Sequence, residues 1–346
     1  MSRAQLTSTV EQNTGGAVSP YVGAKNFLAN GGFDFWQRGT SFSSAASIYT
    51  TVYSADRWYF VSNYTGSSAA YTLTRQSAGV AGFQYAAKIQ RTSGQTATGS
   101  IQLQQSMETA TSIPLAGKTV TLSFYAKAGA NYSATSNLLV VRLFTGTGTD
   151  ENVQTGYAGF QTQLDTTATL TTTMQRFSYQ VAIPSTATEI GLVFLSNPTG
   201  TAGADDSFYI TGVQLEVGSV ATPFSRAGGT LQGELSLCQR YFWQISSANI
   251  DRVAAQAISS TRAFGPLLLP VTMRTAPSYS FAAASNFGLI NSSGGVLTCT
   301  TVSIAAQATN MVTLDFTSSG GGLTAGNATA CWFQSTSSTI ALSAEL

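Results

Sequence analysis

The sequence of 346 residues predicts an all-β protein, with a jelly-roll β-sandwich followed by a short helix and a second, smaller β-sandwich-like domain. Three observations support this fold class. Charged residues make up only 9% of the chain, whereas exposed helices normally carry many Glu, Lys and Arg side chains. Thr, Val, Tyr and Phe, which suit a pleated and half-buried surface, are frequent. Segments that alternate polar and apolar residues recur between stretches rich in Gly, Asn and Pro.

Residues 1–26 are polar and contain Gly15, Gly16, Pro20 and Gly23, which predicts an extended N-terminal arm. A tail without fixed structure would have the same composition, and so would an arm that docks on another subunit. The composition leaves both interpretations open.

Residues 27–224 carry the repeated strand signals of the predicted jelly roll. The clearest segment is 119–125, where Val120, Leu122 and Phe124 share one face. The segment 138–144 is more continuously apolar, as expected of a central strand. Further strands are expected at residues 71–75, 100–104, 177–183, 189–195 and 208–216. Strands at this spacing favour a β-sandwich, and the jelly roll is the arrangement we expect.

Residues 225–243 are the predicted linker and short helix. Leu235, Leu237, Cys238, Tyr241 and Phe242 recur at helical spacing, which predicts a helix over 234–242. Alternation returns in residues 244–346, where strands are expected at 296–304, 311–316, 330–334 and 340–346. This last region is the predicted smaller β domain.

The absence of histidine is the strongest argument against catalysis. Without an imidazole, the chain forms no Ser–His or Cys–His nucleophile pair and no histidine-ligated metal site. Carboxylate pairs remain chemically open, and Asp150–Glu151 and Asp205–Asp206 are adjacent in the sequence. Adjacent residues of a strand point to opposite faces, however, so neither pair is a ready dyad. We expect a protein that is not an enzyme.

The remaining composition excludes several partners. A net charge of +1 predicts no nucleic-acid-binding face. No apolar run is long enough for membrane insertion, and no secretory signal follows Met1, so we expect synthesis in a cytoplasm. The widely spaced Cys238, Cys299 and Cys331 fit neither a disulfide framework nor a zinc site.

Aromatic and acidic residues supply the candidate binding positions. Tyrosines among Ser, Gly and Asn are typical of adaptable binding loops. The candidate ligand-binding residues are Tyr49, Tyr53, Tyr64, Tyr132 and Tyr157. Acidic loops also suit a structural calcium ion, for which the candidate ligands are Asp34, Asp205 and Asp206, although no EF-hand spacing is present. No other cofactor is expected.

Four segments resemble, in order, the sequence elements of a domain found in bacteriophage tail-fibre and related virion proteins. Residues 30–39 contain Asn-Gly-x-Phe-x-x-Trp-Gln-Arg-Gly, and residues 55–58 read Ala-Asp-Arg-Trp. Residues 213–224 read Val-Gln-Leu-Glu-Val-Gly-Ser-Val-Ala-Thr-Pro-Phe, and residues 237–242 read Leu-Cys-Gln-Arg-Tyr-Phe. Residues 270–277 and 343–346 also look like the region that follows in such proteins. The resemblance covers residues 26–346.

The resemblance implies a jelly roll similar to carbohydrate-binding modules, mounted on a virion and commonly homotrimeric. It implies attachment to other phage tail or capsid proteins, for which residues 1–26 are the expected segment, and contact with host cell-surface polysaccharide. Because the chain has so few charges, we expect Asp34, Arg38, Asp56 and Arg57 to form a structural network of Arg–carboxylate pairs.

Three functions remain open from the sequence. The chain is expected to be a short tail fibre or appendage that binds a host glycan or receptor. A purely architectural head fibre, decoration or collar protein is the first alternative. A capsular polysaccharide depolymerase that uses a carboxylate pair is the second.

Overall fold

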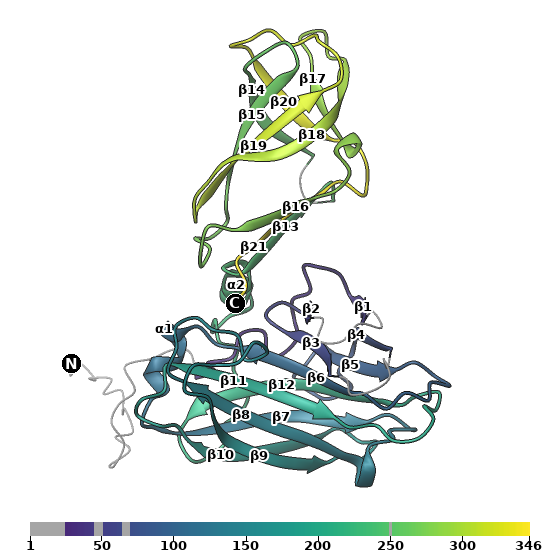
Figure 1. The fold of residues 1–346 in the computed structure, drawn as a ribbon, viewed down its shortest axis with the longest axis vertical. Coiled ribbons are helices and arrows are strands. Elements are labelled where there is room, and N and C mark those ends of the chain that lie inside the picture. Colours follow the sequence, from purple (N-terminus) through teal and green to yellow (C-terminus); the bar gives the residue numbers. More distant parts are fainter. Residues whose placement is uncertain (1–24, 45–50, 64–69, 249–250) are drawn as a thin grey trace, which may run out of the picture.

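The computed structural model describes residues 25–44, 51–63, 70–248 and 251–346, which form a broad β-sandwich and a narrower β domain stacked on it (Figure 1). Almost all of the predicted arm lies outside the described residues. No helix among the described residues is long and apolar enough to cross a membrane.

The β-sandwich consists of two antiparallel sheets of six strands each. The first sheet contains, in order, β1 (Ser41–Ser43), β4 (Tyr71–Ser77), β5 (Tyr85–Arg91), β12 (Ser207–Val217), β7 (Thr119–Ala128) and β10 (Gln175–Ala182). The second contains β2 (Thr51–Tyr53), β3 (Tyr59–Asn63), β6 (Ser100–Ser106), β11 (Glu189–Ser196), β8 (Leu138–Gly146) and β9 (Gln161–Thr169).

The strand order confirms the predicted jelly roll. Counted along the chain from β5 to β12, the first strand pairs with the eighth, the second with the seventh, the third with the sixth and the fourth with the fifth. Such nested antiparallel pairs, distributed alternately over two sheets, define a jelly roll. The alternation expected in β7 is present, since Val120, Leu122 and Phe124 are fully buried between the sheets.

The segment after β12 folds back over the outer face of the first sheet. Gly218, with a φ of 126°, makes the turn that starts it. The carboxylate of Glu216 then accepts hydrogen bonds from the Thr222 amide (2.8 Å) and the Thr222 hydroxyl (2.6 Å). The side-chain oxygen of Gln214 accepts one from the Ser225 amide at 2.7 Å. The run of residues 213–224 noted in the sequence is therefore a strand and its covering segment.

The short helix is present, but it begins earlier than predicted. Helix α2 spans Leu231–Gln239, because the Thr230 hydroxyl accepts a hydrogen bond from the Gly233 amide at 3.0 Å and caps its first turn. Phe242, which the periodicity placed in the helix, instead starts strand β13 (Phe242–Ser246). Glu234 in the first turn is fully buried and accepts hydrogen bonds from the Gly228 and Asn30 amides.

The second domain contains a closed barrel and a small sheet, where a sandwich-like arrangement was expected. The barrel consists, in order, of β14 (Arg252–Ala257), β15 (Arg262–Leu268), β19 (Met311–Ser318), β18 (Val296–Gln307), β17 (Phe287–Ile290) and β20 (Ala328–Phe333). It closes because β14 pairs with both β15 and β20, which leaves no free edge. A sheet of β13, β21 (Thr339–Ser343) and β16 (Ser278–Phe281) lies between the barrel and the jelly roll (Figure 1).

Candidate site at the domain junction

The two N-terminal motifs of the sequence meet at Asn30. This residue is fully buried and has a φ of 55°, a left-handed conformation that Asn tolerates. Its side-chain nitrogen donates to the main-chain oxygens of Phe35 and Asp56, both at 2.9 Å. Its main-chain oxygen accepts the indole N–H of Trp58 at 3.1 Å. Asn30 thus joins the first motif to the Ala-Asp-Arg-Trp segment.

Gln37 connects the same two motifs to the segment after α2. Its amide N–H donates to one oxygen of the Asp56 carboxylate at 3.0 Å, and its side-chain nitrogen donates to the other at 2.7 Å. The same nitrogen also lies 2.8 Å from the main-chain oxygen of Phe242. Three separate stretches of sequence are therefore tied together around one buried carboxylate.

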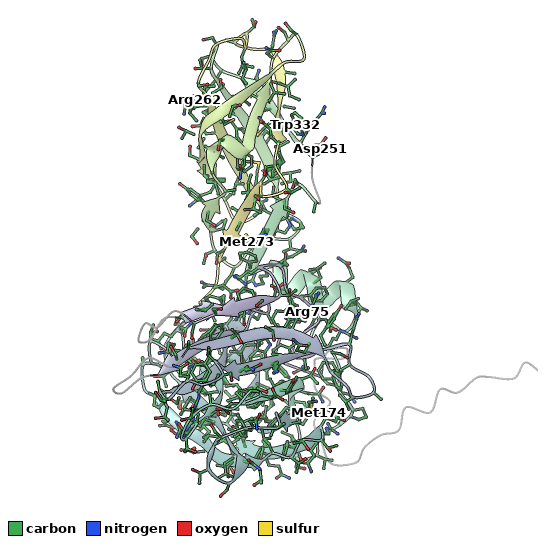
Figure 2. All side chains as sticks on the ribbon, turned by 90° about the vertical axis from the view of Figure 1, so that its right-hand side faces the viewer. Arg75, Met174, Asp251, Arg262, Met273 and Trp332 are labelled. Carbon is green, nitrogen blue, oxygen red and sulfur yellow. The ribbon has the colours of Figure 1, made fainter. Side chains whose placement is uncertain are left out.

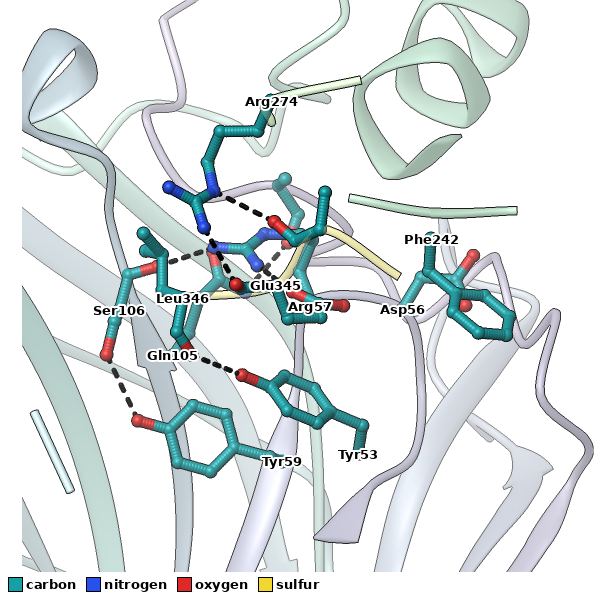
Figure 3. Close-up of polar contacts among 12 residues, drawn as sticks. Tyr53, Asp56, Arg57, Tyr59, Gln105, Ser106, Phe242, Arg274, Glu345 and Leu346 are labelled. Atoms are coloured by element: carbon teal, nitrogen blue, oxygen red, sulfur yellow. Dashed lines mark hydrogen bonds and ion pairs between the residues drawn. The ribbon is translucent and has the colours of Figure 1, made fainter. Parts of the chain in front are cut away.

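Glu345 completes a charged network at this junction (Figure 3). Its carboxylate accepts from Arg38 at 3.0 Å on one oxygen and from Arg57 on the other. Arg57, only 4% exposed, also donates to the Ser106 main-chain oxygen at 2.7 Å, and its guanidinium carbon lies 3.4 Å from the centre of the Tyr241 ring. Arg38 stacks similarly on Phe242 at 3.5 Å. Aromatic stacking and forked hydrogen bonding are the contacts for which arginine is suited.

Arg274 connects the chain segment that carries Glu345 to the jelly roll. Its guanidinium donates to the main-chain oxygens of Ala344 and Glu345, both at 2.8 Å (Figure 3). A third nitrogen lies 3.1 Å from the Asp150 carboxylate, in the loop between β8 and β9. The barrel domain is thus fixed to the jelly roll by side chains from both.

Burial strongly perturbs the titration of this network. Desolvation raises the pKa of Asp56 to about 6, although the hydrogen bonds from Gln37 and the charge of Arg38 act in the opposite direction. Burial alone lowers the pKa of Arg57, but the nearby Glu345 charge outweighs it and holds that pKa above its ordinary value. Burial, with the Glu345 charge, raises the pKa of Tyr53 to about 12, so Tyr53 remains a hydrogen-bond donor at neutral pH.

A pocket of about 460 Å³ opens beside this network, at the end of the outer face of the second sheet. Its lining combines one aromatic ring, two carboxylates, an amide and two hydroxyls. These groups belong to Tyr53, Asp150, Glu151, Asn152, Thr51 and Thr155, with Gly156 and Leu346 completing the wall. Tyr53 and Asn152 both donate to the Leu346 main-chain oxygen at 2.9 Å, which sets the positions of the ring and the amide.

A second pocket, of about 250 Å³, lies on the side of the junction where α2 packs. Its wall is mainly apolar, with Phe27, Met107 and Leu237 among its residues. At its rim Arg240 forks onto Glu108, with both nitrogen–oxygen distances at 3.1 Å. The Leu-Cys-Gln-Arg-Tyr-Phe run therefore contributes one more contact that holds the two domains together.

The structure brings the predicted tyrosines to different places. Tyr49 and Tyr64 lie outside the described residues. Tyr53 lines the 460 Å³ pocket. Tyr157 is a packing residue, because its ring lies over Gly146 and Gly191 and is only 6% exposed. Tyr132 packs against the main core and donates to the Leu138 main-chain oxygen at 3.1 Å, so it too is a structural residue.

The predicted network is present in three of its four residues. Arg38 approaches Asp56 to 4.0 Å, and Arg57 joins them through Glu345. Asp34 is not part of it, since its carboxylate pairs with Arg226 at 2.8 Å. The prediction missed Glu345 as the shared acceptor. Residues 343–346 had been noted only because they look like the corresponding region of the phage proteins.

The candidate calcium ligands do not form one site. Asp205 pairs with Lys88 at 2.8 Å, and Asp206 lies 3.3 Å from Arg91 and accepts from the Ser133 amide and hydroxyl. Among the described residues, no three acidic, cysteine or histidine side chains are grouped as a metal site requires.

Comparison with known proteins gave matches only among solved structures. No family model and no curated protein matches the chain. It is similar to a structure described as CBM4, at 22% identity over 55% of this chain and 98% of that one, with a TM-score of 0.33. It is also similar to TmCBM61 in complex with β-1,4-galactotriose, at 14% identity over 56% of this chain and all of that one, with a TM-score of 0.32. The enzymatically active domain of bacteriophage CBA120 tailspike protein 4 matches at 13% identity over 56% of this chain and 21% of that one, with a TM-score of 0.34.

Proposed function

We propose that this chain is a non-catalytic appendage protein of a bacteriophage virion that binds a glycan of the host surface in the pocket beside Tyr53. The observation that carries the glycan part is the composition of that pocket, which places one aromatic ring among carboxylate, amide and hydroxyl groups. The phage part is supported by the ordered sequence elements of residues 26–346.

The pocket chemistry suits a sugar. An aromatic ring offers a flat apolar surface to the C–H face of a pyranose, while its hydroxyls need donors and acceptors around the edge. Tyr53 supplies the ring, and Asn152 and Thr155 supply amide and hydroxyl groups. Asp150 and Glu151 supply acceptors, with Asp150 held in place by Arg274 and the Thr109 amide. A volume of about 460 Å³ lies within the range of small-molecule sites.

In this proposal the junction network has a mechanical role. Arg38, Arg57 and Arg274 hold the barrel domain in one orientation on the jelly roll, so the protein projects from the particle as a rigid unit. Residues 1–26 attach it to tail or capsid proteins, and it assembles as a homotrimer. It is made in the host cytoplasm and reaches the outside on the virion.

Two assays test the proposal. The first measures binding of the protein to a printed array of bacterial surface oligosaccharides, and the second measures adsorption to host cells. Tyr53→Ala is expected to weaken binding by up to about tenfold, since an aromatic contact is worth ~0.5–1.5 kcal/mol. Tyr53→Phe keeps the ring and is expected to retain most binding. Tyr279→Ala, which removes an exposed tyrosine on β16, is the matched control. Equal binding by all four proteins, or binding to no sugar, would contradict the proposal.

A purely architectural role is the second candidate, and one observation favours it. The polar groups of the motif residues Asn30, Gln37 and Arg57 form hydrogen bonds inside the molecule. Virions that lack the protein would then be incomplete or unstable, but any that form would adsorb normally. Release of reducing ends from host polysaccharide would instead assign a depolymerase that uses Asp150 or Glu151.

A further inference from the structure

Trp332 is half-buried on the outer wall of the barrel and, unlike the other three tryptophans, does not pack against a hydrophobic core. Trp36 and Trp58 belong to the core of the jelly roll, and Trp243 packs against the core of the second domain. Trp332 lies on β20, and its indole N–H donates to the Asp251 carboxylate at 2.9 Å. Figure 2 shows Trp332 and Asp251 side by side at the edge of the barrel.

Arg252 joins these two side chains from the neighbouring strand. It is the cross-strand partner of Trp332, and its guanidinium carbon lies 5.9 Å from the centre of the indole ring. It also pairs with Asp251 at 3.2 Å, with both charged side chains more than half exposed. An ion pair this exposed contributes little to stability, so the barrel does not depend on it.

On the other side of the indole the cross-strand neighbour is Gly288 of β17, which has no side chain of its own. The side chains of Gln334 and Val296 fill the space beside the Gly288 α-carbon. The ring is therefore bordered by a guanidinium and carboxylate on one side and by an amide and an aliphatic side chain on the other. Its orientation is set by the hydrogen bond to Asp251.

We propose that Asp251, Arg252 and Trp332 form a second saccharide-binding site, for the face of a neutral pyranose. The indole offers the stacking surface, the carboxylate accepts from a sugar hydroxyl, and the guanidinium donates to a neighbouring one. The Asp251–Arg252 pair has no net charge, and its acceptor and donor side by side match a pair of uncharged hydroxyls. The inference rests on the proposed glycan function and adds a second sugar contact, on the barrel domain.

The test combines the oligosaccharide array with the indole N–H signals of the full-length protein in nitrogen-15 NMR spectra. The chain has four tryptophans, and the Trp332→Phe variant identifies the signal of Trp332. Titration with glucose, galactose and N-acetylglucosamine is expected to shift this signal and leave that of Trp58 in place. Asp251→Asn and Arg252→Ala, which spare the ring, are each expected to weaken array binding by about tenfold, as loss of one hydrogen bond to a charged group implies. Tyr279→Ala is again the control.

The outcomes separate this site from the pocket beside Tyr53. Loss of binding in the Asp251 and Arg252 variants, with a shifted Trp332 signal, supports the second site. Unchanged binding in those variants, with loss in Tyr53→Ala, overturns the second site alone. No sugar binding by the wild-type protein overturns both. A change in molecular mass by light scattering in the Arg252 variant, without any sugar-induced shift, would instead assign the patch to contact between copies of the chain.

Discussion

Arg57 and Glu345 stand 288 positions apart in the sequence and form a buried ion pair between the jelly roll and the segment that follows the last strand. Their side chains are only 4% and 5% exposed. The guanidinium also stacks on Tyr241 and donates to the Ser106 main-chain oxygen, so Arg57 makes its polar and aromatic contacts inside the molecule.

Replacing Arg57 by methionine is expected to destabilise the protein strongly. Met fills a similar volume but removes the positive charge that offsets the buried Glu345 carboxylate. Breaking a buried ion pair in this way costs about 3–5 kcal/mol of unfolding free energy. Urea denaturation measures the loss. The exposed pair Arg142–Asp165, with side chains 35% and 53% exposed, gives the matched control. Arg142→Met is expected to change the unfolding free energy by ~1 kcal/mol or less. Similar losses in the two variants would refute a special role for Arg57.

The buried Asp56 predicts a particular dependence of stability on pH. Its pKa in the folded protein, about 6, lies above the ordinary value of 3.8, so the folded state holds its proton more tightly than the unfolded chain. Its contribution is fully present below about pH 4 and is lost as pH rises through 6. With one pKa unit worth ~1.4 kcal/mol, the loss amounts to ~3 kcal/mol. Asp56→Asn removes the titration, so the stability of the wild type relative to this variant should fall between pH 4 and 7. A constant difference would show that Asp56 does not titrate there.

Gly31 is expected to tolerate no side chain. A β-carbon at this position would lie 1.9 Å from the main-chain oxygen of Val213. The Val213 amide donates to the Gly31 main-chain oxygen at 2.9 Å, which holds the first motif close to β12. Gly31→Ala should therefore cost at least ~2 kcal/mol, in the range of overpacked cores. At Gly320 a β-carbon would meet no atom within 4 Å, so Gly320→Ala should be neutral or slightly stabilising. Thermal unfolding of the two variants in parallel checks the difference, and equal midpoints would rule it out.

The fold-back segment after β12 depends on Thr222. Thr222→Val keeps the shape but removes the hydroxyl that donates to Glu216 at 2.6 Å. Hydrogen bonds to charged groups are worth ~1.5–3 kcal/mol, and a loss of this size is expected. Thr72→Val in β4 of the same sheet is the control and should be near neutral, since Val suits a strand. Native-state hydrogen exchange should show faster exchange of the Thr222 and Ser225 amides only in the first variant.

Most of the fold was predictable because strand alternation records which face is buried. Val120, Leu122 and Phe124 alternate in sequence because the two sheets enclose only one face of β7. Barrel closure had no such local signal. It depends on pairing of β14 with β20, which are far apart in the chain, and the same alternation fits an open sandwich. The helix boundary was displaced because Tyr241 and Phe242 are apolar for another reason: they stack under Arg57 and Arg38.

The site residues were less predictable than the strands. Tyr53, Tyr132 and Tyr157 share a setting of small polar residues, yet strand register and loop packing place only Tyr53 at a pocket. The Arg38–Asp56 proximity followed from the scarcity of charge. Glu345 did not, because residues 343–346 were noted only through the resemblance, and that resemblance does not indicate a contact with Arg57. Trp332 was expected only as part of a strand, and its exposure depends on the barrel wall.

The long sequence separation between Arg57 and Glu345 also bears on how the protein is made. Chains grow from the N-terminus, so all strands of the jelly roll leave the ribosome before Glu345 is synthesised. Until then Arg57 and Arg38 lack their shared carboxylate acceptor, and only the rings of Tyr241 and Phe242 are available to stack on them. We therefore expect the barrel to take its final orientation late, after the strands of both domains have been synthesised. A nascent chain would carry a folded jelly roll in which Arg38 and Arg57 have not yet paired with Glu345.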